Sequence, residues 1–206
     1  MKLIYVYDAL CGWCYGFTPV IQQLQQQFQD IEFEILSGGM LLNTNRRAAS
    51  AMYSYLQEAH KRVEETTGVI FGSSFLNEYL LTDDLMDSEK PGIALTVFKQ
   101  YQPANAVNFA HDMQVALNYH GHSLNTDTVY SQLAEKYQIP AEEFLEKIKD
   151  EKNRNATYAE FNQVQQWGIT AFPAAIVDTG EQLYLIARGY TPIEHIVEAL
   201  REIKQK

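Results

Sequence analysis

Two cysteines lie three positions apart, at residues 11 and 14, and the chain has no others. They follow directly on "KLIYVYD" (residues 2–8), whose β-branched and aromatic side chains predict a strand that is buried on both faces. After them, residues 14–29 place apolar side chains at helical spacing, with glutamines on the remaining face. These apolar residues are Val20, Ile21, Leu24 and Phe28. The two thiols are therefore expected where a buried strand passes into the first turn of a helix.

A second strand is expected after this helix. In "IEFEILSGG" (residues 31–39), Ile31, Phe33 and Ile35 alternate with glutamates, and the pattern stops at the glycine pair. Strand, helix and strand make a βαβ unit. Its two strands are expected to be parallel, because the connection between them is long enough for a right-handed crossover.

The remainder of the chain divides into a helical part and a second part with strands. Residues 42–167 show helical spacing almost throughout, and strand character returns after Gly168 in "GITAFPAAIVD" and "QLYLIARG". A turn signal at Thr179-Gly180 joins these two strands, and the final segment predicts an amphipathic helix. With 206 residues, 46% of them hydrophobic, the chain can bury a sizeable core. We expect one α/β sheet domain, residues 1–41 plus 168–206, interrupted by a helical domain at 42–167.

The charge balance excludes some classes of partner. Lys and Arg number 16 against 26 Asp and Glu, a formal net charge of −10, which argues against a general binder of nucleic acid or of anionic membranes. The first residues lack the apolar run of a secretory signal, and no stretch of about 18 apolar residues predicts a membrane span. These observations predict a cytoplasmic protein.

The cysteine pair has three possible roles: a redox-active dithiol, half of a metal site, or two inert apolar residues. A tetrahedral zinc site needs two more ligands, and the histidines show neither a second paired spacing nor a nearby partner. They stand at positions 60, 111, 120, 122 and 195. We therefore expect no metal and no organic cofactor, and the redox and inert roles remain open at this point.

A C-x-x-C pair beside a βαβ pattern in a chain of cytosolic character is typical of a thioredoxin-like redox motif. The unpaired N–H groups and the positive dipole end of a helix amino terminus stabilise a thiolate placed there. The second cysteine, one turn further on, can attack a mixed disulfide formed at the first. This places Cys11 as the attacking thiol and Cys14 as the resolving thiol.

Two further segments carry a resemblance to a known family. Pro19 lies five residues after Cys14, and "GITAFPAAIV" is similar to the segment that precedes the third strand of thioredoxin-fold proteins. With "CGWCYGF", the chain resembles the DsbA family over essentially its full length, in the cytosolic FrnE-like branch of predicted disulfide isomerases. The resemblance implies a thioredoxin-like fold, βαβ…ββα, with an all-helical domain between the second and third strands. It also implies a cis Phe172-Pro173 bond whose proline faces the dithiol.

Several residues around the cysteine pair are expected to take part in the site. Gly12 and Trp13, between the cysteines, and Pro173 are expected to support the active site. Phe172, through its backbone, and Trp13 and Tyr15, as an exposed rim, are expected to bind substrate, although Trp13 and Tyr15 could instead pack against the helical domain. Asp8 could carry a proton for the buried thiol, but a turn or cap role is favoured. The methionines at 40, 52, 86 and 113 are expected to fill the core.

These expectations favour a thiol–disulfide oxidoreductase or isomerase that exchanges its dithiol with cysteines of proteins or of small thiols, glutathione included. The alternative within the same fold is a glutathione-dependent transferase or isomerase, of the kappa-class or 2-hydroxychromene-2-carboxylate isomerase kind. Those relatives typically carry a serine at the position of Cys11, so the intact pair counts against them. The alternative from another class is a non-catalytic binding module that senses redox state.

Overall fold

The computed structural model describes residues 1–205. The strands are β1 (Lys2–Tyr7), β2 (Glu32–Ser37), β3 (Arg47–Ala48), β4 (Leu85–Met86), β5 (Ala174–Asp178) and β6 (Leu183–Arg188). The helices are α1 (Gly12–Gln27), α2 (Ala49–Thr67), α3 (Ser73–Asn77), α4 (Glu89–Tyr101), α5 (Ala106–Asn118), α6 (Asp127–Lys136), α7 (Ala141–Lys149), α8 (Glu151–Gln166) and α9 (Ile193–Lys204), with short 3₁₀ turns η1 (Asn43–Asn45), η2 (Tyr79–Leu81) and η3 (Pro103–Asn105). None of the helices within these residues is long and apolar enough to cross a membrane.

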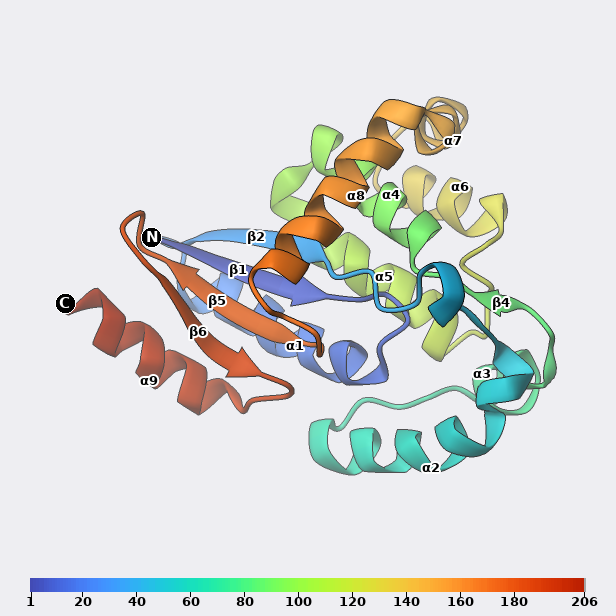
Figure 1. Cartoon of the computed structure of the whole chain (residues 1–206), viewed down its shortest axis with the longest axis horizontal. Helices are drawn as coiled ribbons and strands as arrows, with labels where there is room; N and C mark the ends of the chain where they lie inside the picture. Colours follow the sequence, from blue (N-terminus) through green and yellow to red (C-terminus); the bar gives the residue numbers. More distant parts are fainter. Residues whose placement is uncertain (206) are drawn as a thin grey trace.

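Four strands form the main sheet, in the order β2-β1-β5-β6 (Figure 1). β1 pairs in parallel with β2, as the predicted βαβ unit requires, and antiparallel with β5 on its other side. β5 and β6 form the predicted antiparallel hairpin. The thioredoxin-like arrangement of the α/β chain is therefore confirmed. β1 is an inner strand of the sheet, with β2 on one side and β5 on the other.

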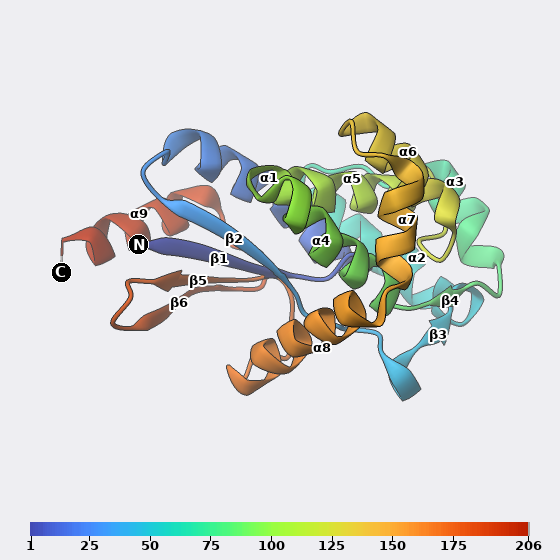
Figure 2. The ribbon, with the colours of Figure 1, turned by 90° about the horizontal axis from the view of Figure 1, so that it is seen from above.

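Both faces of this sheet are covered, which explains why β1 has no polar side. Leu3, Tyr5 and Tyr7 point to the face that α1 and α9 cover, whereas Ile4 and Val6 point to the opposite face, where Val164 of α8 packs. Figure 2 shows α1 and α9 on one side of the sheet and α8 on the other. The predicted burial of the strand on both faces is thus confirmed.

The insertion between β2 and β5 is helical, as expected, apart from one short pair of strands. β3 pairs antiparallel with β4, with Arg47 opposite Met86 and Ala48 opposite Leu85. Strands of two residues are too short to show an alternating pattern, so the sequence did not predict them. Because α8 of the insertion packs on the main sheet, the division into domains at residues 42 and 167 stays a proposal.

Candidate active site

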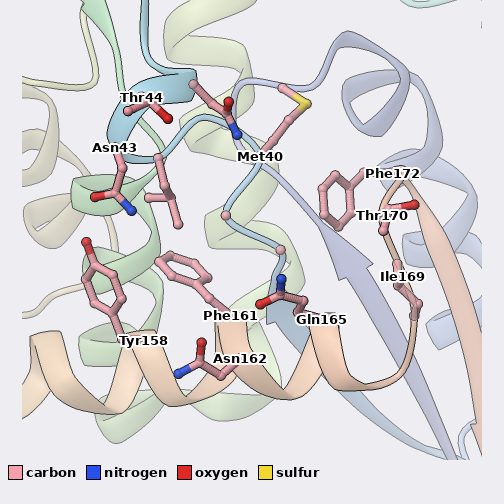
Figure 3. A pocket seen from close by; sticks show the side chains of 14 residues that line it. Met40, Asn43, Thr44, Tyr158, Phe161, Asn162, Gln165, Ile169, Thr170 and Phe172 are labelled. Atoms are coloured by element: carbon pink, nitrogen blue, oxygen red, sulfur yellow. The ribbon is translucent and has the colours of Figure 1, made fainter.

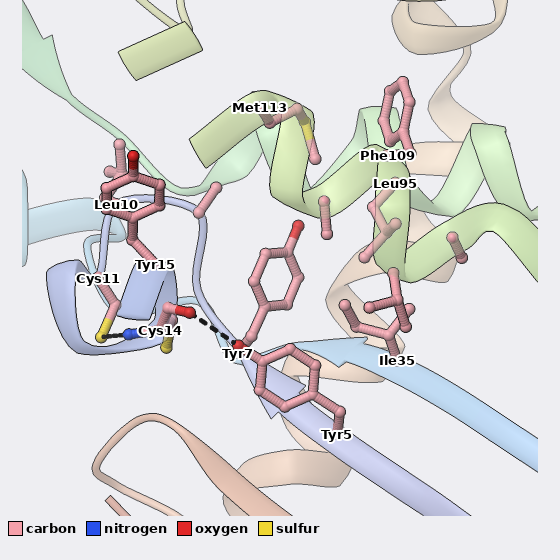
Figure 4. Packing of buried hydrophobic residues seen from close by; sticks show 14 of the residues in the cluster. Tyr5, Tyr7, Leu10, Cys11, Cys14, Tyr15, Ile35, Leu95, Phe109 and Met113 are labelled. Carbon is pink, nitrogen blue, oxygen red and sulfur yellow. Dashed lines mark hydrogen bonds between the residues drawn. The ribbon is translucent and has the colours of Figure 1, made fainter. Parts of the chain in front are cut away.

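Cys11 occupies the amino-terminal cap of α1 (Figure 4). Its backbone is extended, with φ −85° and ψ 112°, and its Sγ accepts a hydrogen bond from the Cys14 N–H at 3.3 Å. A side chain at this position replaces one of the hydrogen-bond partners that the first turn of a helix lacks. The first turn of α1 therefore offers a backbone hydrogen-bond donor to the Cys11 sulfur.

The two thiols differ in how far they are buried. Both are free, but Cys11 is 6% exposed and Cys14 is fully buried. Burial raises the pKa of the Cys14 thiol well above its ordinary value, and its hydrogen bond with Cys11 raises that pKa further. Cys14 is therefore a protonated thiol at neutral pH, and a reactant coming from solvent meets the sulfur of Cys11 first.

This burial of Cys14 makes the stability of the reduced protein depend on pH. The folded-state pKa is raised, so the stabilisation is fully present below the unfolded-state pKa and is lost as the pH rises towards the folded-state value. Relative to Cys14→Ala, we expect the reduced protein to lose about 1.4 kcal/mol of unfolding free energy per pH unit above about pH 8.5. Urea denaturation between pH 7.5 and 9.5 measures this difference. Parallel pH profiles for the two proteins would contradict it.

The loop before β5 reaches the dithiol. The Phe172-Pro173 peptide bond is cis, as the family resemblance implied. The Cys11 thiol donates to the carbonyl oxygen of Phe172, with 3.5 Å between the two atoms. Phe172 is half-buried and Pro173 is buried. This loop therefore approaches the dithiol through the Phe172 backbone, and contact of the Pro173 ring with the sulfurs stays a prediction.

Asp8 anchors the loops around the dithiol. Its buried carboxylate accepts hydrogen bonds from the Leu10 N–H at 3.0 Å, the Met40 N–H at 2.7 Å and the Ser88 hydroxyl at 3.0 Å. Burial raises the pKa of Asp8, and these donors oppose the rise by stabilising the charged form. The geometry is that of the favoured turn role, because one side chain joins the end of β1 to two other segments. Its charge also contributes to the raised pKa of Cys14.

Tyr15 corrects one expectation. It is 6% exposed, its hydroxyl donates to the Ile70 carbonyl oxygen at 3.1 Å, and its ring packs edge-on against Phe71 and stacks on His111. Tyr15 is therefore not part of an exposed rim, because the first turn of α1 directs it into the helical insertion. Trp13, in contrast, is only half-buried and lines the cavity above Cys11.

A cavity of about 480 Å³ opens above Cys11, and we call it the cysteine cavity. Leu10, Cys11, Gly12 and Trp13 form one of its walls, and α2 forms another. Its other lining residues are largely apolar: Met40, Leu41, Met52, Tyr55, Leu56, Ala59, His60, Val63, Phe71, Phe75, Met86, Asn118, Thr170, Ala171 and Phe172. Three of the four methionines expected in the core thus line this cavity: Met40 and Met52 are half-buried, whereas Met86 is buried in the core as Met113 is. Nothing in their spacing distinguishes a core methionine from a cavity methionine.

Buried polar groups hold the first turn of α1 against β1 and α5. The Tyr5 hydroxyl lies 3.2 Å from the Cys14 carbonyl oxygen and 3.0 Å from the Thr18 hydroxyl, which in turn lies 2.8 Å from the amide oxygen of Gln114. Figure 4 shows Tyr5 reaching from β1 to the Cys14 backbone. The network connects the sheet, α1 and α5 directly beneath Cys14.

Within residues 1–205, no group of three or more His, Cys, Asp or Glu side chains is arranged to hold a metal ion. The residues that meet at the dithiol are instead Cys11, Cys14, Trp13 and the backbone of Phe172, with Gly12 close to the ring of Phe71. A methyl group on Gly12 would lie 3.2 Å from that ring, so the glycine allows the two segments to pack closely. This arrangement suits sulfur chemistry with an apolar reactant.

Several solved structures share the fold of this chain. The chain is similar to a candidate protein disulfide isomerase from Nitrosomonas europaea, at 28% identity over 99% of this chain and 97% of that one, with a TM-score of 0.88. It has the fold of the cytosolic disulfide reductase DsbM from Pseudomonas aeruginosa, at 20% identity over the full length of both, with a TM-score of 0.84. That reductase has also been solved with glutathione, and in that form it matches at 21% identity over 91% of this chain and 90% of that one, with a TM-score of 0.78.

A more distant match is a 2-hydroxychromene-2-carboxylate isomerase, at 11% identity over 100% of this chain and 95% of that one, with a TM-score of 0.61. No curated protein sequence matches the chain. The family model of the DSBA-like thioredoxin domain matches residues 2–201, which is nearly the whole chain. The chain therefore belongs to the family of DSBA-like thioredoxin domains.

Proposed function

We propose that this protein is a thiol–disulfide oxidoreductase in which Cys11 attacks the substrate and Cys14 resolves the intermediate. The observation that carries the proposal is the unequal placement of the two sulfurs. Cys11 caps a helix and lines a cavity, whereas Cys14 is fully buried one turn further on. This arrangement supplies a nucleophile that a substrate can reach through the cysteine cavity, together with an internal thiol that only an enzyme-bound disulfide can reach.

The proposed reaction needs no metal and no organic cofactor. The Cys11 thiolate attacks one sulfur of a substrate disulfide, so that a Cys11–substrate bond forms, the substrate disulfide breaks, and the departing thiolate takes a proton from water. Cys14 then gives up its proton to solvent and attacks the Cys11 sulfur, which forms the Cys11–Cys14 disulfide and releases the second substrate thiol. Two electrons pass to the substrate, and an external thiol reductant restores the dithiol. Run in reverse, the same steps oxidise a substrate.

For the setting of this reaction we propose the cytoplasm, with protein disulfides or small-thiol disulfides as substrates. DsbM, which shares the fold over the full length of the chain, is described as a cytosolic disulfide reductase and has been solved with glutathione. A reducing thiol pool would keep the dithiol reduced, and such a dithiol acts as a reductase or an isomerase.

Reduction of insulin disulfides with dithiothreitol as the final reductant tests the proposal. We expect the protein to accelerate the reduction, and we expect no conjugation of glutathione to an aromatic electrophile and no isomerisation of 2-hydroxychromene-2-carboxylate. The intact dithiol is the reason, because the glutathione-dependent relatives typically carry a serine at the first cysteine. Conjugation or isomerisation without disulfide reduction would overturn the proposal, and absence of all three activities would favour a binding module.

A further inference from the structure

A second cavity lies on the other side of the loop that contains Phe172 (Figure 3). Its volume is about 450 Å³, and η1 and α8 form its opposite walls. The side chains that carry amide or hydroxyl groups into its lining are Asn43, Thr44, Asn45, Tyr158, Asn162, Gln165 and Thr170. We call it the amide cavity.

The amide side chains of this cavity are available to a ligand. Those of Asn43, Asn45, Asn162 and Gln165 are exposed, and within residues 1–205 these side chains form no hydrogen bond with another part of the protein. Each amide offers a donor and an acceptor, the same pair that a peptide group offers. A ligand with alternating N–H and C=O groups would therefore complement the amide side chains of η1 and α8.

The amide cavity does not favour a charged ligand. Among the described residues, no Lys, Arg, His, Asp or Glu lines it, whereas His60 lines the cysteine cavity. A carboxylate bound in the amide cavity would lose hydration without gaining an opposite charge, which is costly, and the net charge of −10 adds repulsion. Glutathione carries carboxylates at both ends, whereas the middle of a polypeptide segment carries none on its backbone.

The two cavities share part of their lining next to Cys11. Met40, Thr170 and Phe172 line both of them, and the Phe172 carbonyl oxygen is the atom that lies 3.5 Å from the Cys11 sulfur. The ring of Phe172 rests directly on the backbone of Gly38, where an added methyl group would lie 2.0 Å from the ring. A group bonded to Cys11 therefore has an apolar cavity on one side of Phe172 and an amide-lined cavity on the other.

We propose that the amide cavity is a second substrate subsite, which binds the uncharged backbone of a polypeptide segment next to the reacting cysteine. In this arrangement the cysteine cavity takes an apolar side chain of the same segment. The inference rests on the proposed disulfide exchange and narrows its substrates to polypeptide disulfides with uncharged flanking residues. Small charged disulfides do not fill the amide cavity.

Two substitutions in α8 test this subsite. Gln165→Lys puts a charge into the lining of the amide cavity, and the matched control Gln166→Lys puts the same charge on the adjacent exposed residue, which does not line it. The probes are a disulfide-linked decapeptide with uncharged polar residues around its cysteines and bis(2-hydroxyethyl) disulfide, which is too small to reach the cavity from Cys11. The measured quantity is the ratio of kcat/KM for the peptide to kcat/KM for the small disulfide.

We expect Gln165→Lys to lower this ratio at least about fivefold, as the loss of one or two hydrogen bonds would, and Gln166→Lys to leave it unchanged. For a decapeptide with aspartates around its cysteines, the Gln165→Lys ratio should rise above that of the wild type. A ratio that is unaltered in Gln165→Lys, or lowered equally in both variants, would overturn the subsite. Failure of the wild type to reduce either disulfide would instead overturn the proposed function itself.

Discussion

Replacing Cys11 by serine should reduce disulfide turnover to the level of the uncatalysed exchange. A hydroxyl at the cap of α1 is not ionised at neutral pH and cannot form a disulfide, so the first step of the proposed reaction is lost. Cys14 cannot substitute for Cys11, because it is fully buried and its pKa is raised. Steady-state reduction of insulin by dithiothreitol measures the loss.

Serine is also the natural choice for this position because it caps helices well, and we expect the variant to fold. The melting temperature of Cys11→Ser, compared with that of the reduced wild type, checks this. Turnover above background in a folded Cys11→Ser protein would mean that Cys14 can start the reaction alone, which contradicts the assigned roles.

Gly72→Ala should be among the most destabilising single-methyl additions in the chain. A Cβ at this position would lie 1.7 Å from the carbonyl oxygen of Tyr119 and 2.6 Å from its carbonyl carbon. Both are backbone atoms, and the Gly72 N–H is already bonded to the Asn118 carbonyl oxygen at 2.9 Å. Both segments of this contact are held by their backbones. We therefore expect a loss of about 3 kcal/mol in the free energy of unfolding, the upper part of the range for overpacking.

The matched control is Gly68→Ala, at the end of α2. Gly68 has a left-handed φ of 77° but no atom within 4 Å of an added Cβ, so its replacement costs only the conformational strain, about 1 kcal/mol. Urea denaturation of both variants measures the two losses. A smaller loss of unfolding free energy for Gly72→Ala than for Gly68→Ala would show that the segment between α2 and α3 shifts freely. Such a shift would also move Phe71, the neighbouring residue, which lines the cysteine cavity.

The parts of the fold that the sequence predicted well are those that local pattern determines. A continuous apolar run predicted β1 as a strand with both faces covered, and the turn signal at Thr179-Gly180 predicted the β5–β6 hairpin. The spacing of the cysteines after β1 predicted that Cys11 would lie at the start of a helix. The cis bond before Pro173 was expected from the family resemblance and not from local propensity.

The features that the sequence did not predict depend on contacts between distant segments. The direction of Tyr15 is set by Ile70, Phe71 and His111, which belong to the insertion and give no local signal at residue 15. The two cavities are lined by segments between residues 10 and 172 that only the tertiary fold brings together. Their amide side chains occur in polar stretches that are typical of solvated loops and helix faces.

Trapping of the mixed disulfide tests the assigned roles of the two cysteines most directly. Cys14→Ser retains the attacking thiol and lacks the resolving one, so an intact-mass measurement after incubation with a disulfide-linked peptide should show one half of that peptide bound to Cys11. Cys11→Ser, treated in the same way, should show no adduct. Adducts of equal yield in both variants, or an adduct in Cys11→Ser alone, would contradict the account of Cys11 as the attacking thiol and Cys14 as the resolving thiol.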